Sequence, residues 1–143
     1  MKKLILIIAL TVSVFANDII IKDSNHSVSQ TIKNIKDIVT KKGINVFAVI
    51  DHGSNAAKAG LQMREAQVII FGNPKLGTRL MNANIVSGLD LPLKILVYKD
   101  VDEKVKLAYR DGSWLKSKHG LKLNRLTNKM NKILNNITNK AIK

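Results

Sequence analysis

The residues best suited to chemistry gather between positions 71 and 93, around two glycines and one isolated acid. We call residues 72–78 the glycine loop. Gly72 and Gly77 have the spacing of the glycines in a phosphate-binding P-loop and follow an apolar run typical of a strand. That motif requires a lysine directly after the second glycine, where this sequence has Thr78. Because no lysine is placed to reach the β- and γ-phosphates, nucleotide hydrolysis is not predicted.

The glycine loop still carries donors for a carboxylate or a phosphate. The side chains of Asn73, Lys75 and Thr78 lie beside Gly77 in the sequence, and turn amides can form anion-binding concavities. A tight turn, with glycines at positive φ and Pro74 as a stiffener, explains the pattern equally well. Both interpretations stay open at this stage.

Asp90 is the only acid in an apolar run and lies between Leu89 and Leu91. A carboxylate in such a run must be paired or hydrogen-bonded, because burial of an isolated charge is costly. Lys75 or the amides of the glycine loop are the expected partners. We therefore interpret Asp90 first as the residue that organises the loop and second as a catalytic group.

His52 follows Asp51 at the end of a predicted strand. Its imidazole could ligate a metal or haem iron, or act as a general base, but a structural histidine with a backbone partner is favoured. Met81 could be a soft axial ligand beside it, although packing is the commoner role of methionine. His26 and His119 have no regular spacing to His52, and zinc usually takes three or four protein ligands. No metal site is predicted, and the cofactor remains unknown.

The first sixteen residues have the three parts of a secretory signal peptide. Two lysines follow Met1, an apolar run covers residues 4–14, and small residues precede a cut after Ala16. The chain has no cysteine, which excludes disulfides, thiolate catalysis and c-type haem attachment. We expect a periplasmic or extracellular protein in which residues 17–143 form a single domain.

The basic character of the chain is concentrated near its C-terminus. The formal net charge is +14, and residues 112–143 contain eight bases and no acid. Export and the scarcity of aromatic side chains argue against nucleic acid as a partner. Apolar residues recur at helical spacing beside a basic stripe from Lys122 to Lys132. Such a helix could contact an anionic membrane, but packing of its apolar face on a sheet is favoured.

Alternating and β-branched runs predict a sheet in which residues 93–98 and 104–109 form a hairpin, and helical spacing predicts a helix before it and one after it, an α+β fold. Ser27 is expected to cap the first helix, with Gln30 at the capping-box position, and Gly43 to close it. The last helix is expected around Leu123–Ile137, and a short helix within residues 54–66. The predicted strands are residues 18–22, 44–50, 67–71, 93–98 and 104–109.

Four runs of the sequence resemble a known bacterial family. They are residues 47–52, 56–61, 71–78 and 89–98, which include Phe47-Ala48-Val49-Ile50-Asp51-His52, Phe71-Gly72-Asn73-Pro74-Lys75-Leu76-Gly77-Thr78 and Leu89-Asp90-Leu91-Pro92. They are similar to the family called domain of unknown function 302. The resemblance implies a curved antiparallel sheet with two helices, similar to a TATA-binding-protein-like fold, and a homodimer. It implies no reaction.

These observations favour a small-ligand-binding module with its site between the glycine loop and His52. The predicted ligand-binding residues are His52, Asn73, Lys75, Gly77, Thr78 and Asp90. One alternative is a hydrolase-like or other enzyme that uses His52 with Asp51 or Asp90, and the catalytic residues are then unknown. Another is a structural or partner-binding domain whose basic stripe meets an acidic surface.

Overall fold

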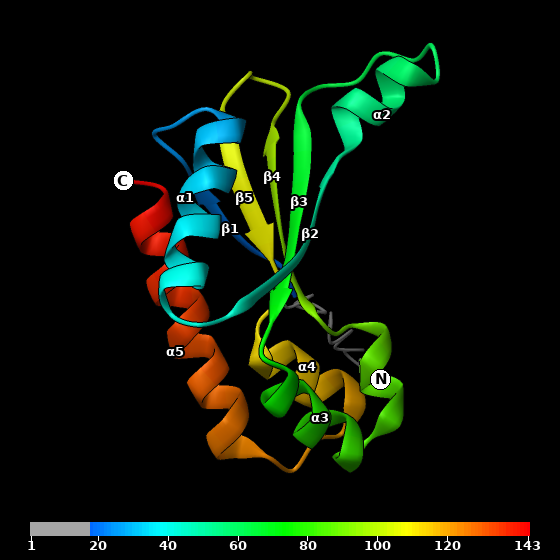
Figure 1. The fold of residues 1–143 in the computed structure, drawn as a ribbon, viewed down its shortest axis with the longest axis vertical. Coiled ribbons are helices and arrows are strands. Elements are labelled where there is room, and N and C mark those ends of the chain that lie inside the picture. The colour runs from blue at the N-terminus through cyan, green and yellow to red at the C-terminus, as the bar shows by residue number, and fades with distance from the viewer. Residues whose placement is uncertain (1–17) are drawn as a thin grey trace, which may run out of the picture.

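The computed structural model describes residues 18–143, which build a five-stranded antiparallel sheet (Figure 1). The strands lie in the order β1-β5-β4-β3-β2. The predicted antiparallel α+β fold is therefore confirmed. The predicted signal peptide and its cleavage site after Ala16 lie outside the described residues. The strands are β1 (Ile20–Asp23), β2 (Asn45–Asp51), β3 (Ala66–Gly72), β4 (Leu93–Lys99) and β5 (Val105–Tyr109).

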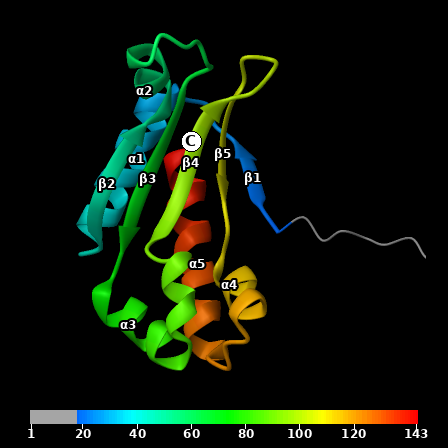
Figure 2. The same ribbon diagram turned by 90° about the vertical axis from the view of Figure 1, so that its right-hand side faces the viewer.

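Two long helices cover one face of this sheet, and shorter helices lie at its two ends. The long helices, α1 and α5, lie behind the sheet in Figure 2, whereas α2 projects at one end and α3, η1 and α4 gather at the other. The sequence predicts two main helices and one short helix. The structure has three further short helical elements, α3, η1 and α4. The helices are α1 (Val28–Lys41), α2 (His52–Lys58), α3 (Pro74–Ala83), η1 (Ile85–Leu89, a 3-10 helix), α4 (Gly112–His119) and α5 (Asn124–Ala141).

Helix α1 begins as the sequence predicts. The Ser27 hydroxyl accepts a hydrogen bond from Gln30 N at 3.2 Å, which satisfies one of the backbone donors at the helix start. The Gln30 side chain bonds Asn34 instead of reaching back, so only half of the capping box forms. Gly43 follows the helix at φ +67, a conformation that glycine adopts without steric cost.

The main core lies between the sheet and the two long helices. Apolar side chains at every second strand position face α1 and α5, as the pleat of a strand requires. The predicted packing of the last helix on the sheet is confirmed, because its apolar face is buried there. The core includes Val28, Ile35 and Val39 of α1, Ile69, Phe71, Ile95, Val97 and Leu107 of the sheet, and Leu134 and Ile137 of α5.

A second apolar cluster holds the lower helices together. Leu80 of α3, Leu115 of α4, Leu121 between α4 and α5, and Met130 of α5 pack there and are buried. Burial of each such side chain contributes about 1.5–3 kcal/mol. This cluster fixes α3 against α5 and so positions the glycine loop.

The opposite face of the sheet carries a row of apolar side chains. Cross-strand neighbours place Ile21, Ala108, Leu96, Val68 and Ile50 in register across all five strands. In Figure 2 this face points toward the viewer, and neither long helix covers it. We call these five residues the open-face row.

Candidate functional site

The glycine loop is the junction between a strand and a helix. β3 ends at Gly72, and Asn73 caps α3 by accepting a hydrogen bond from Lys75 N at 2.9 Å. Pro74 occupies the first helical position, where its missing N–H costs nothing. Gly77 lies inside α3, and neither glycine has a positive φ. The tight-turn interpretation is therefore wrong, because asparagine and proline start a helix here.

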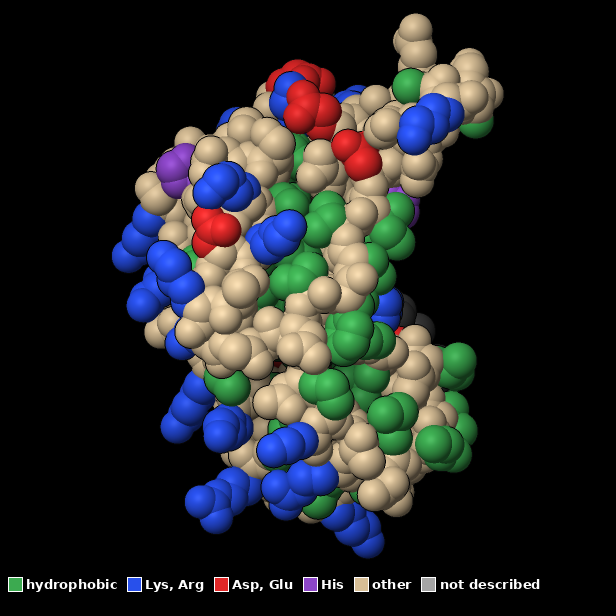
Figure 3. Space-filling view, in the orientation of Figure 1, with side chains coloured by type: hydrophobic (Ala, Val, Ile, Leu, Met, Phe, Trp, Pro, Cys, Tyr) green, Lys and Arg blue, Asp and Glu red, His purple; other side chains and the backbone are tan. Residues whose placement is uncertain are grey.

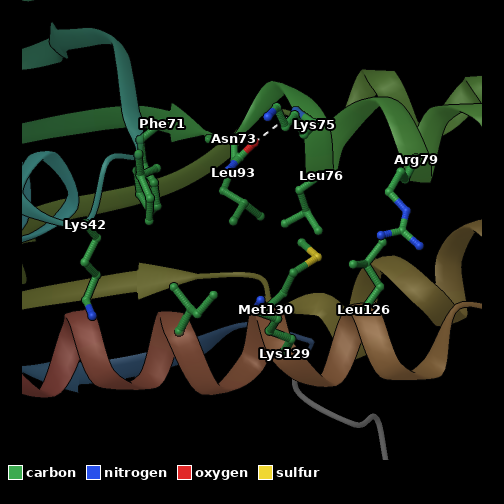
Figure 4. Close-up of a pocket in the computed structure, with 13 residues that line it drawn as sticks. Lys42, Phe71, Asn73, Lys75, Leu76, Arg79, Leu93, Leu126, Lys129 and Met130 are labelled. Atoms are coloured by element: carbon green, nitrogen blue, oxygen red, sulfur yellow. Dashed lines mark hydrogen bonds between the residues drawn. The ribbon is translucent and has the colours of Figure 1, made fainter.

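A cavity of about 520 Å³ opens between the start of α3 and the middle of α5 (Figure 4). We call it the α3–α5 cavity. It borders the glycine loop through Gly72, Asn73 and Lys75. The close-up shows side chains from α3, β4 and α5 pointing toward a shared space. Its apolar lining comes mainly from Phe71, Leu76, Leu93, Leu126, Met130 and Ile133.

The rim of the α3–α5 cavity is basic. Lys42 follows α1, Lys75 and Arg79 belong to α3, and Lys129 belongs to α5; all four are exposed. The described residues that line the cavity include no Asp, Glu or His. Uncompensated positive charge beside a recess raises the local concentration of anions.

A neighbouring hollow extends this basic surface. Its volume is about 610 Å³, and it shares Arg79, Leu126 and Lys129 with the α3–α5 cavity. Lys122 and Arg125 line it as well. Figure 3 shows Lys and Arg side chains gathered over the lower end of the molecule, where α5 begins.

The other side of the glycine loop borders a third, more apolar cavity. It has a volume of about 370 Å³ and is lined by Gly77, Thr78 and Met81 together with Phe47 and Leu91. Asn73 borders both cavities, whereas Lys75 faces only the first. The predicted residues of the glycine loop are therefore divided between two sides of one helix.

His52 lies at the other end of the molecule. Asn45 pairs with Gly72 and Asp51 with Gln67, so the length of β2 separates His52 from the glycine loop. Seven residues of strand span about 20 Å at about 3.3 Å each. The structure therefore does not assemble the predicted site between the loop and His52. Met81, in α3, is likewise not beside His52.

The Asp51 carboxylate already has structural partners. It accepts hydrogen bonds from Ser54 N at 2.8 Å and from Gln67 Nε2 at 3.0 Å. It thus caps α2 and ties that helix to β3. His52 itself is exposed at the first position of α2.

Asp90 pairs with a histidine that sequence reasoning did not select. Its Oδ2 lies 2.7 Å from His119 Nε2, and the His119 side chain is only 8% exposed. The Trp114 and His119 rings pack edge to face, with 6.4 Å between their centroids. The Arg110 guanidinium carbon lies 4.5 Å from the centroid of the Trp114 ring. The expected partnership of Asp90 with Lys75 or the loop amides is wrong, because the end of α4 supplies the partner.

Groups with shifted pKa values lie away from the α3–α5 cavity. Burial lowers the pKa of Lys22 and raises the pKa of Tyr109. The Lys22 Nζ lies over the Tyr109 ring, 5.8 Å from its centroid. Within residues 18–143, no three His, Asp or Glu side chains are grouped to hold a metal ion. The described lining of the cavity offers basic side chains and apolar surface.

Three members of the cavity rim are not among the site residues predicted from the sequence. Lys42 directly follows α1 and Arg79 lies in α3, and tertiary packing brings the two side chains to one rim. Lys129 belongs to the basic stripe noted above, next to the apolar positions Leu126 and Met130. Its helical spacing was the one available signal.

The family model described as "Domain of unknown function DUF302" matches residues 20–137. The chain belongs to this family. A crystal structure of an uncharacterized conserved DUF302 protein from Bacillus stearothermophilus has the same fold, with a TM-score of 0.78 at 19% identity. The match covers 88% of this chain and 99% of that one.

Curated relatives of this DUF302 chain carry the name of a channel. The fluoride-specific ion channel FluC 1 of Brucella suis biovar 1 and FluC 2 of Brucella melitensis biotype 1 are each 40% identical over 111 residues. The match covers 78% of this chain but only 44% and 41% of theirs. This chain thus spans less than half the length of these relatives. Among residues 18–143, no helix has the length and apolar character needed to cross a membrane.

Proposed function

We propose that this DUF302 protein is an extracytoplasmic module that binds a small ligand in the α3–α5 cavity. The proposal rests on the cavity, which lies beside Asn73 and Lys75 and is rimmed by four basic side chains. Its volume of about 520 Å³ lies within the range of about 300–1,000 Å³ that is usual for small-molecule sites. Of the six residues first selected, Asn73 and Lys75 belong to this site.

Binding is favoured over catalysis by the chemistry of the lining. General acid–base catalysis needs a titratable group within hydrogen-bond reach of the substrate. The Asp51 carboxylate is used to cap α2, and Asp90 is held by His119. An enzyme that uses His52 with either acid is therefore less well supported than a binding module.

We also propose that the protein is a homodimer joined through the open-face row. The row crosses all five strands, and Ile85 and Leu89 of η1 are 75% and 80% exposed. Figure 3 shows hydrophobic side chains along the right-hand side of the molecule, from the sheet to the lower helices. Extended apolar surface of this kind commonly marks an interface.

The extracytoplasmic location is supported by residues 1–16 alone. Their charged start, apolar run and small residues before the cut are the pattern of a secretory signal. The mature chain is expected to begin at Asn17.

Native mass spectrometry of protein recovered from the cell envelope tests the proposal. We expect a mature chain that carries a small molecule, and lower occupancy in a Lys75→Glu/Arg79→Glu variant. A Lys116→Glu/Lys118→Glu variant has the same charge change on α4, away from the cavity, and should retain the ligand. Full-length chain in the cytoplasm would refute export. Equal ligand loss in both variants, or no bound molecule at all, would refute the site.

A further inference from the structure

The α3–α5 cavity combines two surfaces that attract different parts of a ligand. Leu76, Leu126, Met130 and Ile133 form an apolar floor between α3 and α5. A wholly hydrophilic ion would leave these apolar side chains exposed to water, so its binding would gain no free energy from their burial. The occupant therefore needs an apolar portion that lies along the floor.

The rim selects the charge of the occupant. Arg79 and Lys129 stand where the cavity meets the neighbouring hollow, and Lys122 and Arg125 continue the basic surface beyond them. The described residues that line the two spaces include no acid. A cationic ligand would be repelled here, and a neutral ligand would make no use of the charge. An anionic head is the complementary group.

The position of the cavity favours a dissolved molecule over a membrane surface. None of the described large hydrophobic side chains that are exposed lies in the cavity lining; those of η1 and those of the segment after α2, Leu61 and Met63, lie elsewhere. Peripheral insertion needs an apolar face that protrudes beside the basic groups. Here the apolar surface is recessed between two helices, so a single chain has to enter it.

We propose that the cavity binds a single-chain amphiphile with an anionic head, a carboxylate or a phosphate. The inference rests on the proposed function and specifies the ligand class of the same site. The hydrocarbon chain lies along the partly buried side chains of Leu76, Leu126 and Ile133, and the head is held by Arg79 and Lys129. Charge-assisted hydrogen bonds from arginine suit either head group.

Calorimetric titration of the purified protein with octanoate, decanoate and dodecanoate, all below their aggregation concentrations, tests this class. Affinity should rise about fourfold for each added methylene, which corresponds to about 0.8 kcal/mol. Dodecyltrimethylammonium has the same chain with the opposite charge and should bind at least tenfold more weakly. Acetate and inorganic phosphate should not bind detectably.

Charge-reversal variants locate the head. Arg79→Glu and Lys129→Glu should each weaken dodecanoate binding about tenfold or more, because a charged hydrogen bond is lost. Lys140→Glu makes the same charge change on α5 outside the cavity and should leave the affinity within twofold. Equal losses in Lys129→Glu and Lys140→Glu would show attraction by net charge alone and would overturn the proposal.

Three further results would overturn the ligand class, and they separate it from the proposed function. Affinity independent of chain length, with binding that Lys129→Glu still abolishes, would keep the cavity as a site for another small anion. Binding only to vesicles that contain anionic lipid would reassign the surface to membranes. No binding of any probe, with no molecule retained from the cell envelope, would remove the proposed function as well.

Discussion

At the scale of single residues, the contact between Asp90 and His119 joins the segment before β4 to the end of α4. His119 Nε2 and Asp90 Oδ2 lie 2.7 Å apart, and the aspartate side chain is 27% exposed. The imidazole is almost buried, so removal of the carboxylate would leave its nitrogen without a partner. An unpaired buried polar group costs more than the bond itself contributes.

Asp90→Ala is expected to lower the free energy of unfolding by about 1–3 kcal/mol. Because the two groups share one interaction, Asp90→Ala and His119→Ala should be non-additive, with a coupling of about 0.5–3 kcal/mol. Urea denaturation of the two single variants and the double variant measures both quantities. His52→Ala, an exposed histidine at the other end of the molecule, should stay within about 0.5 kcal/mol. Additive effects of Asp90→Ala and His119→Ala would contradict the pairing.

The sequence predicted that Asp90 needs a hydrogen-bonding partner, but it did not identify that partner. An acid between leucines requires a donor whatever the fold, so the type of interaction followed from local composition. His119 is 29 positions away, and only the packing of α4 brings it close. The same reason explains why Lys75 and Asn73 were predicted for the site while Lys42 and Arg79 were not. The predicted position of His52 beside the glycine loop was wrong, because His52 follows the far end of β2, one strand length away from the loop.

At the scale of elements, α5 stabilises the sheet through one buried face. Leu134→Ala should lower the free energy of unfolding by about 2–5 kcal/mol, because the side chain is 1% exposed and its removal leaves a cavity. Leu126→Ala should cost less, since Leu126 is half-buried at the α3–α5 cavity. Asn136→Ala, on the exposed side of α5, is the matched control for helix propensity. Thermal or urea unfolding measures all three variants. A loss below about 0.5 kcal/mol for Leu134→Ala would contradict the packing.

The turn between β4 and β5 predicts an acid-sensitive contribution to stability. Partial burial raises the pKa of Asp100, but hydrogen bonds from Lys104 N and Asp102 N, together with Lys106, lower it below its usual value overall. A carboxylate whose pKa is lower in the folded state stabilises the fold above the unfolded pKa, about 3.9. That contribution disappears as the pH falls through the folded pKa.

Asp100→Asn should therefore destabilise the protein at pH 7, and the difference from the parent should shrink below about pH 4. Urea titrations at a series of pH values measure this difference. Asp102→Asn, whose side chain is exposed in the same turn, is the matched control for the loss of one carboxylate. A constant deficit for Asp100→Asn down to pH 2 would show that the carboxylate charge is not involved.

Periodicity and caps predicted the long elements, whereas three short helical elements, α3, η1 and α4, were not predicted; α3 and α4 have a physical explanation. The strands and α1 carry alternation, helical spacing and a serine cap, all of which are local signals. The sequence does not distinguish a turn from a helix at the start of α3, because Asn73 and Pro74 suit both. The helix is stabilised by Leu80, which is buried in the second apolar cluster with Leu115 and Met130. α4 follows a comparable cap at Asp111.

At the scale of the whole molecule, the two faces of the sheet have different roles. One face is covered by α1 and α5, and the other presents the open-face row (Figure 2). If a second copy covers that row, Leu96→Glu should convert dimers to monomers, because a charge would be buried without a partner. Light scattering after size-exclusion chromatography measures the mass. Asn136→Glu, on the far side of α5, should remain dimeric. A parent that is monomeric at all concentrations would contradict the dimer.

We propose that the ligand site lies between α3 and α5, at the opposite end of β2 from His52. The most direct test is an amide chemical-shift map of the ¹⁵N-labelled protein titrated with dodecanoate. We predict shift changes clustered at residues 72–79 and 126–133, with residues 52–58 unaffected and the changes lost in Arg79→Glu. Shift changes centred on α2, or on the open-face row with the α3–α5 cavity unperturbed, would contradict a site between α3 and α5.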